Sequence, residues 1–311
     1  MKVNRIQFSN YGSASEMYIG EYGLPQLKAD EVQISVKAAA INPLDWKQRR
    51  GDMKLIMGKK FPKGIGNDFA GIVEAVGANV QNIKVGDEVF GTMDVKKPGA
   101  FASKLITQSK FIAKKPTNIS FSEASCLPIG ATVAWAALFL KTKVHKNTRV
   151  LINGCTGAVG SLAVQLAKEK GAWVAGTCSK TETEEAKKIG VDKIFDYNEP
   201  NYWKKSELFD VVFDTAGLMK QTDGFSMLKP NGKFVDINPT PKSMLTGLFK
   251  PKYKFTFATA GMKHLADIAE LVEKGKLKPR IGKEINFENT IDELIKIENG
   301  KGVKGRTVIV F

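Results

Sequence analysis

A glycine-rich loop is the part of this 311-residue chain whose residue types and spacing point most directly to chemistry. Gly157 and Gly160 fit the last two glycines of the G-x-G-x-x-G pattern, which brings a backbone close to a pyrophosphate. Cys155 occupies the place of the first glycine, but cysteine is small and Gly154 before it can supply the tight turn. An apolar strand-like segment precedes the loop and a helical pattern follows it, so a helix N-terminus would face the phosphates. The order strand, loop, helix, strand predicts a dinucleotide site, with a purely structural turn as the alternative. The predicted cofactor contacts in the loop are Gly154, Thr156, Gly157, Ala158, Val159 and Gly160.

The end of the next strand-like segment predicts which dinucleotide is bound. A site that prefers NAD places an acidic residue about 20 residues past the glycines, on the ribose 2′-hydroxyl. Here Ser179 and Lys180 stand in that region, and the first acidic residue is Glu182. A hydroxyl and an ammonium group can hold a 2′-phosphate, whereas a carboxylate would repel it, so the sequence favours NADPH. The alternative is that this segment only caps the following helix, because Thr181-x-x-Glu184 is a capping box.

The elements that must position the loop alternate between strands and helices. Six strand-like segments follow one another after residue 148, and five of them are separated by enough chain for a crossover helix. This alternation predicts an α/β fold with a doubly wound parallel sheet. The six segments are 149–153, 172–177, 193–197, 210–216, 232–238 and 253–259.

The chain before residue 123 has a different pattern, with short apolar segments broken by Gly, Pro and Asn. It predicts a small, mostly β domain over 1–122. An apolar helical stretch over 124–140 opens the second domain, which we expect to span 123–262. An amphipathic helix over 262–275 and the strand "GRTVIVF" at the C-terminus follow, and we expect 263–311 to return to the first domain.

The composition is that of a soluble globular protein, with 43% hydrophobic and 25% charged residues. No apolar run approaches the roughly 18–20 residues that a membrane span needs, and no secretory signal is visible. Three widely spaced cysteines without a CxxC pair predict a reducing, cytoplasmic setting. The net charge of +15 comes from lysines spread in twos and threes, so we expect a solvated basic surface and no dedicated nucleic-acid binding.

Several motifs occur in an order that resembles the medium-chain dehydrogenase/reductase superfamily. They are "AAAINPLDWKQRRG", "GNDFAGIVEAVG", "VGDEVFG", "LPIGATVAWAAL", "NGCTGAVG" and "FDYNE". The chain most resembles the zinc-independent quinone oxidoreductase and enone reductase branch, of the chloroplast-envelope quinone oxidoreductase homologue type. The resemblance covers nearly the whole chain. It implies a GroES-like catalytic domain, a Rossmann domain that binds NADPH, and a homodimer.

The zinc-dependent members of the superfamily test this placement. They would carry a catalytic cysteine near Asn42, Gly-His-Glu where this chain has Gly66-Asn67-Asp68, and four cysteines near 91–105. This chain has no cysteine before Cys126 and only two histidines, so we expect no metal. Alcohol oxidation is difficult without a Lewis acid, whereas hydride transfer to an already electrophilic conjugated acceptor does not need one.

The resemblance also suggests site residues. It places Asn42, Asp45 and Lys47 at the catalytic centre, with the Asn42 amide beside the substrate carbonyl. It places Thr132 at the nicotinamide, and Tyr197 together with Lys180 around the 2′-phosphate. The predicted cofactor contacts further include Ala216 and Arg306. Simpler interpretations remain open: Asn42-Pro43 favours a turn, Thr132 could bond a helix carbonyl, and Asp45 could pair with Lys47 or an arginine.

The predicted activity is NADPH-dependent reduction of a quinone or an α,β-unsaturated carbonyl, without a metal, on a small hydrophobic electrophile. Two alternatives remain. One is a zinc-free alcohol dehydrogenase. The other is a crystallin-like protein that binds NADPH or RNA with little turnover, which the positive net charge leaves open.

Overall fold

The structure is a computed structural model that describes residues 2–199 and 207–311, apart from the side chains of Thr246 and Leu248. The chain divides into two compact units. Unit 1 comprises residues 1–129, 262–273 and 279–311, and unit 2 comprises 130–261 and 274–278. Each unit has its own sheets and its own buried apolar cluster.

Unit 2 is built on a six-stranded sheet in the order β11-β10-β9-β12-β13-β14, and every neighbouring pair is parallel. This is the 3-2-1-4-5-6 order of a Rossmann fold. Each of the six predicted segments overlaps one of these strands, so the predicted doubly wound sheet is confirmed. The strands are β9 (Arg149–Asn153), β10 (Trp173–Cys178), β11 (Lys193–Asp196), β12 (Phe209–Asp214), β13 (Leu228–Asp236) and β14 (Tyr253–Phe255).

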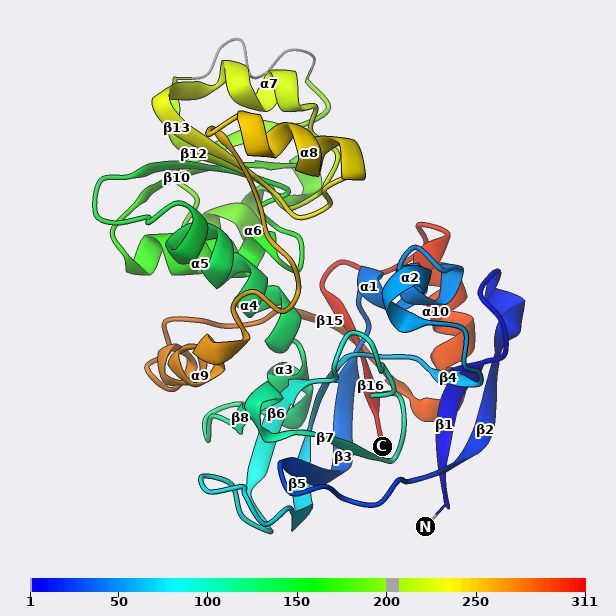
Figure 1. Ribbon diagram of the computed structural model, residues 1–311. Helices are drawn as coiled ribbons and strands as arrows, with labels where there is room; N and C mark the ends of the chain where they lie inside the picture. The colour runs from blue at the N-terminus through cyan, green and yellow to red at the C-terminus, as the bar shows by residue number, and fades with distance from the viewer. Residues whose placement is uncertain (1, 200–206) are drawn as a thin grey trace. The chain divides into compact units, whose positions relative to one another are not determined.

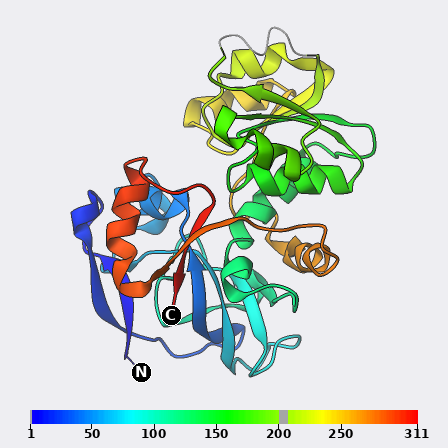
Figure 2. The ribbon, with the colours of Figure 1, turned by 180° about the vertical axis from the view of Figure 1, so that it is seen from behind.

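The helices of unit 2 cover both faces of the sheet. Figures 1 and 2 show α5 and α6 on one face and α7 and α8 on the other. In α5 the residues Leu162, Ala163, Leu166 and Ala167 are buried, as their helical spacing predicts. The helices are α5 (Gly160–Glu169), α6 (Thr183–Lys188), α7 (Gln221–Ser226) and α8 (Pro241–Phe249), with a 3-10 turn at Lys180–Glu182 before α6.

The single helical stretch predicted over 124–140 is broken in the structure. α3 (Phe121–Ser125) ends before the proline, α4 (Pro128–Trp135) begins at it, and a π-helical segment (Ala136–Lys141) follows. Pro128 has no N–H to donate to the preceding turn and is favoured at the start of a helix. The prediction of one continuous helix was therefore wrong.

Unit 1 contains a three-stranded and a seven-stranded sheet. The final strand β16 pairs antiparallel with β3, so the C-terminal strand lies in the same sheet as the N-terminal strands. In both views the red strand β16 lies beside the blue β3 (Figures 1 and 2). The smaller sheet has β1 (Lys2–Phe8), β2 (Met17–Gly23) and β4 (Lys63–Gly64). The larger has β3 (Glu31–Ala40), β5 (Asp68–Val76), β6 (Glu88–Thr92), β7 (Lys104–Gln108), β8 (Ile112–Lys114), β15 (Ile281–Asn286) and β16 (Arg306–Val310).

Helices α1 (Pro43–Arg50), α2 (Lys54–Met57), α9 (Leu265–Glu273) and α10 (Thr290–Glu298) complete unit 1 with α3. The predicted amphipathic helix over 262–275 corresponds to a 3-10 turn at Met262–His264 followed by α9. Three residues of its apolar stripe, Leu265, Ile268 and Val272, are buried, and Ala269 on the same stripe is half-buried. Gly275 follows the helix with φ +67°, a conformation that glycine adopts without strain.

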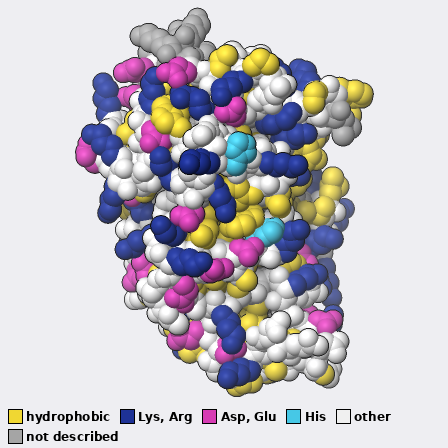
Figure 3. Space-filling view, turned by 90° about the vertical axis from the view of Figure 1, so that its left-hand side faces the viewer, with side chains coloured by type: hydrophobic (Ala, Val, Ile, Leu, Met, Phe, Trp, Pro, Cys, Tyr) yellow, Lys and Arg dark blue, Asp and Glu magenta, His cyan; other side chains and the backbone are white. Residues whose placement is uncertain are grey.

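The basic residues do not form one block on the face shown in Figure 3. There, Lys and Arg side chains are scattered over the surface with acidic side chains between them. This pattern agrees with the sequence, in which lysines occur in twos and threes.

Candidate active site

The glycine loop of unit 2 connects the carboxyl end of β9 to the start of α5, where the strand order reverses. Ligands of such sheets bind at this position. Gly154 has φ +79°, so it supplies the turn that the missing first glycine would make. A Cβ on Gly160 would lie 2.1 Å from the Gly154 carbonyl oxygen, and Gly157 is exposed. The loop therefore offers the bare, closely packed backbone that a pyrophosphate needs, at a helix N-terminus with free N–H groups.

Cys155 fills space in this loop. Its side chain is buried, and a Cβ on the neighbouring Gly176 would lie 2.6 Å from the Cys155 Sγ. Burial raises the pKa of the Cys155 thiol, which keeps it protonated and a poor nucleophile. This agrees with the interpretation of Cys155 as a packed substitute for glycine.

A hydrogen-bonded chain that the sequence analysis did not single out holds the loop to three strands. The Gly154 N–H donates to Thr177 Oγ1 at 2.9 Å, and that hydroxyl donates to Asn153 Oδ1 at 2.7 Å. Asn153 Nδ2 in turn donates to Asp214 Oδ1 at 2.8 Å. Burial raises the pKa of Asp214. A signal was present, because each of these polar residues stands at or next to the end of an apolar strand, and the carboxyl ends of parallel strands meet at one edge.

The residues predicted to hold the 2′-phosphate lie at the ends of two neighbouring strands. Ser179 and Lys180 follow β10, Tyr197 follows β11, and Cys178 is paired with Asp196 in the register of these strands. Lys180 and Tyr197 are exposed, and Tyr197 is 55% exposed. The structure thus brings a hydroxyl, an ammonium group and a phenol to one corner of unit 2. It does not show the capping box at Thr181, because α6 begins at Thr183 with Glu182 as its N-cap.

Two further predicted cofactor contacts also lie in unit 2. Ala216 is exposed, and its Cβ lies 3.3 Å from the position of a Cβ on Gly154, so it borders the loop. Thr132 is buried in α4, where its carbonyl oxygen lies 2.1 Å from the position of a Cβ on Gly261. The absence of a side chain at Gly261 lets the two backbone segments pack together.

Two of the three predicted catalytic residues, Asn42 and Asp45, belong to a buried polar cluster, here called the Asn42 cluster: Asn42, Asp45, Gln48, Asn67, Asp68 and Arg306. Asn42 lies two residues after the end of β3 and is the N-cap of α1, and its side-chain amide bonds in two directions. Its Oδ1 accepts from Arg306 Nη1, and its Nδ2 donates to Asp68 Oδ2 and to the Ala40 carbonyl, each at 3.2 Å. Arg306 also donates to the Ile41 carbonyl oxygen at 3.0 Å.

Asp45 fixes the start of α1 within this cluster. Its Oδ2 accepts from the Asn42 backbone N–H at 2.7 Å, and its Oδ1 accepts from Asn67 Nδ2 at 2.7 Å. Asn67 Nδ2 also donates to Gln48 Oε1 at 2.7 Å. Lys47 lies half-buried on α1.

Two carboxyl groups of the Asn42 cluster titrate far from their ordinary range. Burial raises the pKa of Asp45 to about 7, against the hydrogen bonds from Asn42 and Asn67. Burial likewise raises the pKa of Asp68 to about 7, and the positive charge of Arg306 lowers it less than burial raises it. The guanidinium is thus the countercharge of two carboxyl groups in a site that excludes water.

The positions that hold zinc in related enzymes carry a donor set that does not fit zinc. Zinc prefers thiolate, imidazole and carboxylate ligands. Here Asn42 Nδ2 donates to Asp68 Oδ2, Asn67 Nδ2 donates to Asp45 and Gln48, and the Arg306 guanidinium would repel a cation. Residues 2–199 and 207–311 contain no group of three or more His, Cys, Asp or Glu side chains that could hold a metal.

Comparison with known proteins places these features in a family. Residues 28–117 match the alcohol dehydrogenase GroES-like domain, and residues 189–309 match the zinc-binding dehydrogenase domain. The 2-methylene-furan-3-one reductase of Solanum lycopersicum is 32% identical over 314 residues, covering 97% of this chain and 77% of that protein. The chain belongs to the medium-chain dehydrogenase/reductase superfamily. As a superfamily member it has the GroES-like and Rossmann folds that the resemblance implied.

Other superfamily members similar to this chain are also oxidoreductases. The chloroplastic NADPH-dependent alkenal/one oxidoreductase of Arabidopsis thaliana is 32% identical, covering 88% of this chain and 70% of that protein. The structure of the quinone oxidoreductase from Coxiella burnetii matches with a TM-score of 0.90 and 27% identity over 100% of both chains. Superfamily oxidoreductases bind NAD(P), and the glycine loop fits this cofactor. One of the matching domains is described as a zinc-binding dehydrogenase, but the side chains of the Asn42 cluster do not suit zinc as ligands.

Arg306 and the predicted loop contacts lie in different units. Arg306, predicted among the cofactor contacts, is in the Asn42 cluster of unit 1. Its contact with the cofactor stays a prediction.

Among the described residues, no helix is long and apolar enough to cross a bilayer.

Proposed function

We propose that this chain is an NADPH-dependent reductase of quinones or α,β-unsaturated carbonyls that works without a metal. The observation that carries the proposal is the Asn42 cluster, in which Asn42, Asn67 and Asp68 stand where the resemblance would place zinc ligands and Asn42 is bonded to the Arg306 guanidinium. The proposal is supported by the relatives named as an NADPH-dependent alkenal/one oxidoreductase and a 2-methylene-furan-3-one reductase. Its substrate would be a small hydrophobic electrophile.

The glycine loop and the corner after β10 and β11 would hold the cofactor. The N–H groups at the start of α5 would bind the pyrophosphate, and Ser179, Lys180 and Tyr197 the 2′-phosphate. Bound NADPH supplies a hydride. We propose further contacts to the cofactor from Thr132, Ala216 and Arg306.

The Asn42 cluster would stabilise the negative charge that a reduced acceptor develops on its oxygen. Arg306 holds Asn42 Oδ1, so the amide must present Nδ2 as its donor. Both bonds from Nδ2 are 3.2 Å long, at the weak end of the usual range, so exchanging one for a substrate oxygen costs little. Asp45 acts as a positioning residue through the Asn42 backbone. Lys47 adds a positive charge on the same helix.

The function is tested by mixing NADPH and the chelator-treated protein with a panel of enones, benzoquinones and naphthoquinones. We expect loss of the reduced nicotinamide absorbance with at least one conjugated acceptor, and slower loss in Asn42→Ala. Absence of turnover with the whole panel would contradict the proposal.

The preference for NADPH is tested separately at the corner after β10. Ser179→Ala combined with Lys180→Ala removes two groups that can pair with a 2′-phosphate, and bonds to charged groups contribute about 1.5–3 kcal/mol each. We therefore expect the KM for NADPH to rise by at least about 100-fold, with little change for NADH. Lys187→Ala is the matched control, because Lys187 is exposed nearby on α6 but pairs with Glu184 at 2.8 Å. An equal rise in KM for both cofactors would refute the assignment.

We further propose a homodimer in the cytoplasm. The reducing location is supported by the three cysteines, which are free and buried in the described structure. Sedimentation of the purified protein tests the dimer.

A further inference from the structure

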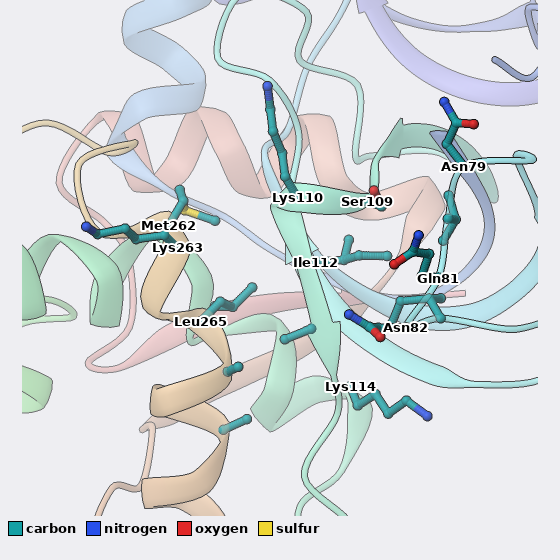
Figure 4. A pocket seen from close by; sticks show the side chains of 15 residues that line it. Asn79, Gln81, Asn82, Ser109, Lys110, Ile112, Lys114, Met262, Lys263 and Leu265 are labelled. Atoms are coloured by element: carbon teal, nitrogen blue, oxygen red, sulfur yellow. The ribbon is translucent and has the colours of Figure 1, made fainter. Parts of the chain in front are cut away.

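Unit 1 contains a pocket of about 710 Å³ between α9 and the loop 79–83 (Figure 4). Apolar side chains of β8 and α9 line one part of it, and amide side chains of the loop line another. The ammonium groups of Lys110 and Lys263 point away from the pocket in different directions, so its charges do not converge on one ligand. The polar groups next to the glycine loop of unit 2, in contrast, form one directed chain of hydrogen bonds.

The hydroxyl of Thr177 is the link of this chain that touches the glycine loop. Thr177 is fully buried in β10, where its register partner on β9 is Asn153. Its Oγ1 accepts from the Gly154 N–H at 2.9 Å and donates to Asn153 Oδ1 at 2.7 Å. Because the hydroxyl proton points to Asn153, a lone pair faces the Gly154 N–H. The direction of the Asn153 amide therefore decides how the hydroxyl meets the loop.

Asp214 fixes the direction of the Asn153 amide. Its Oδ1 accepts from Asn153 Nδ2 at 2.8 Å and from the Gly217 N–H at 3.0 Å, and its Oδ2 accepts from the Met219 N–H at 2.8 Å. These three donors favour the ionised form of Asp214, whereas burial raises its pKa. An ionised carboxylate only accepts, so Asn153 must present its NH2 to Asp214 and its oxygen to Thr177.

The Gly154 peptide is held on its carbonyl side as well. That oxygen accepts from the Gly157 N–H at 3.0 Å and from Thr215 Oγ1 at 3.2 Å. Gly154 itself has φ +79°, and glycine restricts its own backbone less than any other residue. The hydrogen bonds on its two sides, of which the Thr177 hydroxyl makes the one to the N–H, therefore hold this turn in place.

We propose that Thr177 is a positioning residue for the dinucleotide, and that Asp214 sets the direction of its hydroxyl through Asn153. This role rests on the proposed function, in which the glycine loop binds the cofactor pyrophosphate. Because Thr177 is fully buried, it acts through the backbone of Gly154 and the loop that follows. NADPH and NADH share the pyrophosphate, so loss of the hydroxyl weakens the binding of both, whereas changes at the corner after β10 and β11 affect NADPH alone.

Fluorescence titration of the full-length protein with NADPH and with NADH, without an acceptor, tests the role of the hydroxyl. Thr177→Val keeps nearly the same shape but leaves the Gly154 N–H without its acceptor, so we expect both dissociation constants to rise by about tenfold. Thr177→Ser retains the hydroxyl and should keep both within about twofold of the parent. Unchanged affinity in Thr177→Val, or a loss confined to NADPH, would overturn the proposal. Binding of neither cofactor by the parent would refute the proposed function and this role with it.

Thr107→Val is the matched control for a lost buried hydroxyl. Thr107 is buried in β7 of unit 1, and its Oγ1 donates to the Thr92 carbonyl oxygen at 3.2 Å. Both valine variants should lower the thermal unfolding midpoint, but Thr107→Val should leave both dissociation constants within about twofold of the parent. Weakened binding of the same size in Thr107→Val would mean that any lost buried hydroxyl has this effect, and would refute the specific role of Thr177.

Asp214→Asn tests the direction of the hydroxyl. The new NH2 would face an N–H donor whichever way the amide turned, because both carboxylate oxygens accept N–H groups. We expect the binding of both cofactors to weaken by at least about tenfold. Adding Thr177→Val to this variant should weaken binding by less than about threefold further, since the two changes break one chain. Unchanged affinity in Asp214→Asn, or a further loss of about tenfold in the double variant, would overturn the role of Asp214.

Discussion

Replacing Arg306 with methionine is expected to lower the free energy of unfolding by about 3–5 kcal/mol at about pH 8, the usual cost of removing one partner from buried charges. The substitution removes the countercharge of Asp45 and Asp68. It also leaves Asn42 Oδ1 and the Ile41 carbonyl oxygen without the donor they have in the structure. Urea unfolding of the variant and the parent measures the difference.

The same substitution should cost less at about pH 5.5, and the sign follows from the raised pKa values of the two carboxyl groups. With pKa values of about 7 when folded and an ordinary 3.8 when unfolded, Asp45 and Asp68 bind protons more tightly in the folded state. Their contribution to stability is therefore present at low pH and is lost as the pH rises from about 4 to about 7. At about pH 5.5 they are largely protonated and need little countercharge.

Arg50→Met is the matched control for the Arg306 variant. The Arg50 side chain is 45% exposed and makes only long ion pairs, with Asp52 at 3.7 Å and Glu298 at 3.6 Å. Its removal should change the free energy of unfolding by less than about 1 kcal/mol at either pH. An Arg306 variant that loses no more than this control, or that loses equally at both pH values, would contradict the assigned role of the guanidinium.

Replacing Gly160 with alanine is expected to lower the affinity for NADPH by at least about 10- to 100-fold. The new Cβ would lie 2.1 Å from the Gly154 carbonyl oxygen and 3.0 Å from the Cys155 Cα, so the loop backbone must move. Overpacking of this kind costs about 1–3 kcal/mol of stability, and it displaces the N–H groups that would bind the pyrophosphate. Fluorescence titration with NADPH and thermal unfolding measure the two effects.

Two other glycines separate the effect on binding from the effect on folding. A Cβ on Gly23 would meet no atom within 4 Å, so Gly23→Ala should leave both quantities near those of the parent. Gly157 is exposed in the loop, and a Cβ there would be 3.2 Å from the Gly154 oxygen, so Gly157→Ala should weaken NADPH binding with little loss of stability. Unchanged binding in both Gly157→Ala and Gly160→Ala would mean that the loop does not hold the pyrophosphate.

The sheet of unit 2 was predictable because its determinants are local. Each strand is a short apolar segment, and most of the intervening stretches are long enough for the crossover that parallel neighbours require. The segment 149–153 matches β9 in full. Prediction from the local pattern failed where a single residue interrupts an apolar stretch. Pro128 is such a residue, because α3 ends shortly before it and α4 begins at it.

The candidate site was less predictable because its contacts join distant parts of the sequence. Asn42 could be identified as a candidate site residue from the motif around it. The sequence near Asn42 or Arg306 does not reveal that their side chains form a hydrogen bond across 264 positions. The buried state of Asp45 and Asp68, which moves their pKa values, likewise depends on the packing of β3, β5 and β16. The Asn153–Thr177–Asp214 chain had a readable signal in the polar ends of its strands.

The most direct test of a metal-free NADPH-dependent reductase is product analysis with chelator-treated protein, an enone and NADPH deuterated at C4 of the nicotinamide. The account predicts a saturated ketone with deuterium at its former β-carbon, formed at an undiminished rate after chelation. Formation of an allylic alcohol instead, or turnover that appears only when zinc is added, would contradict it.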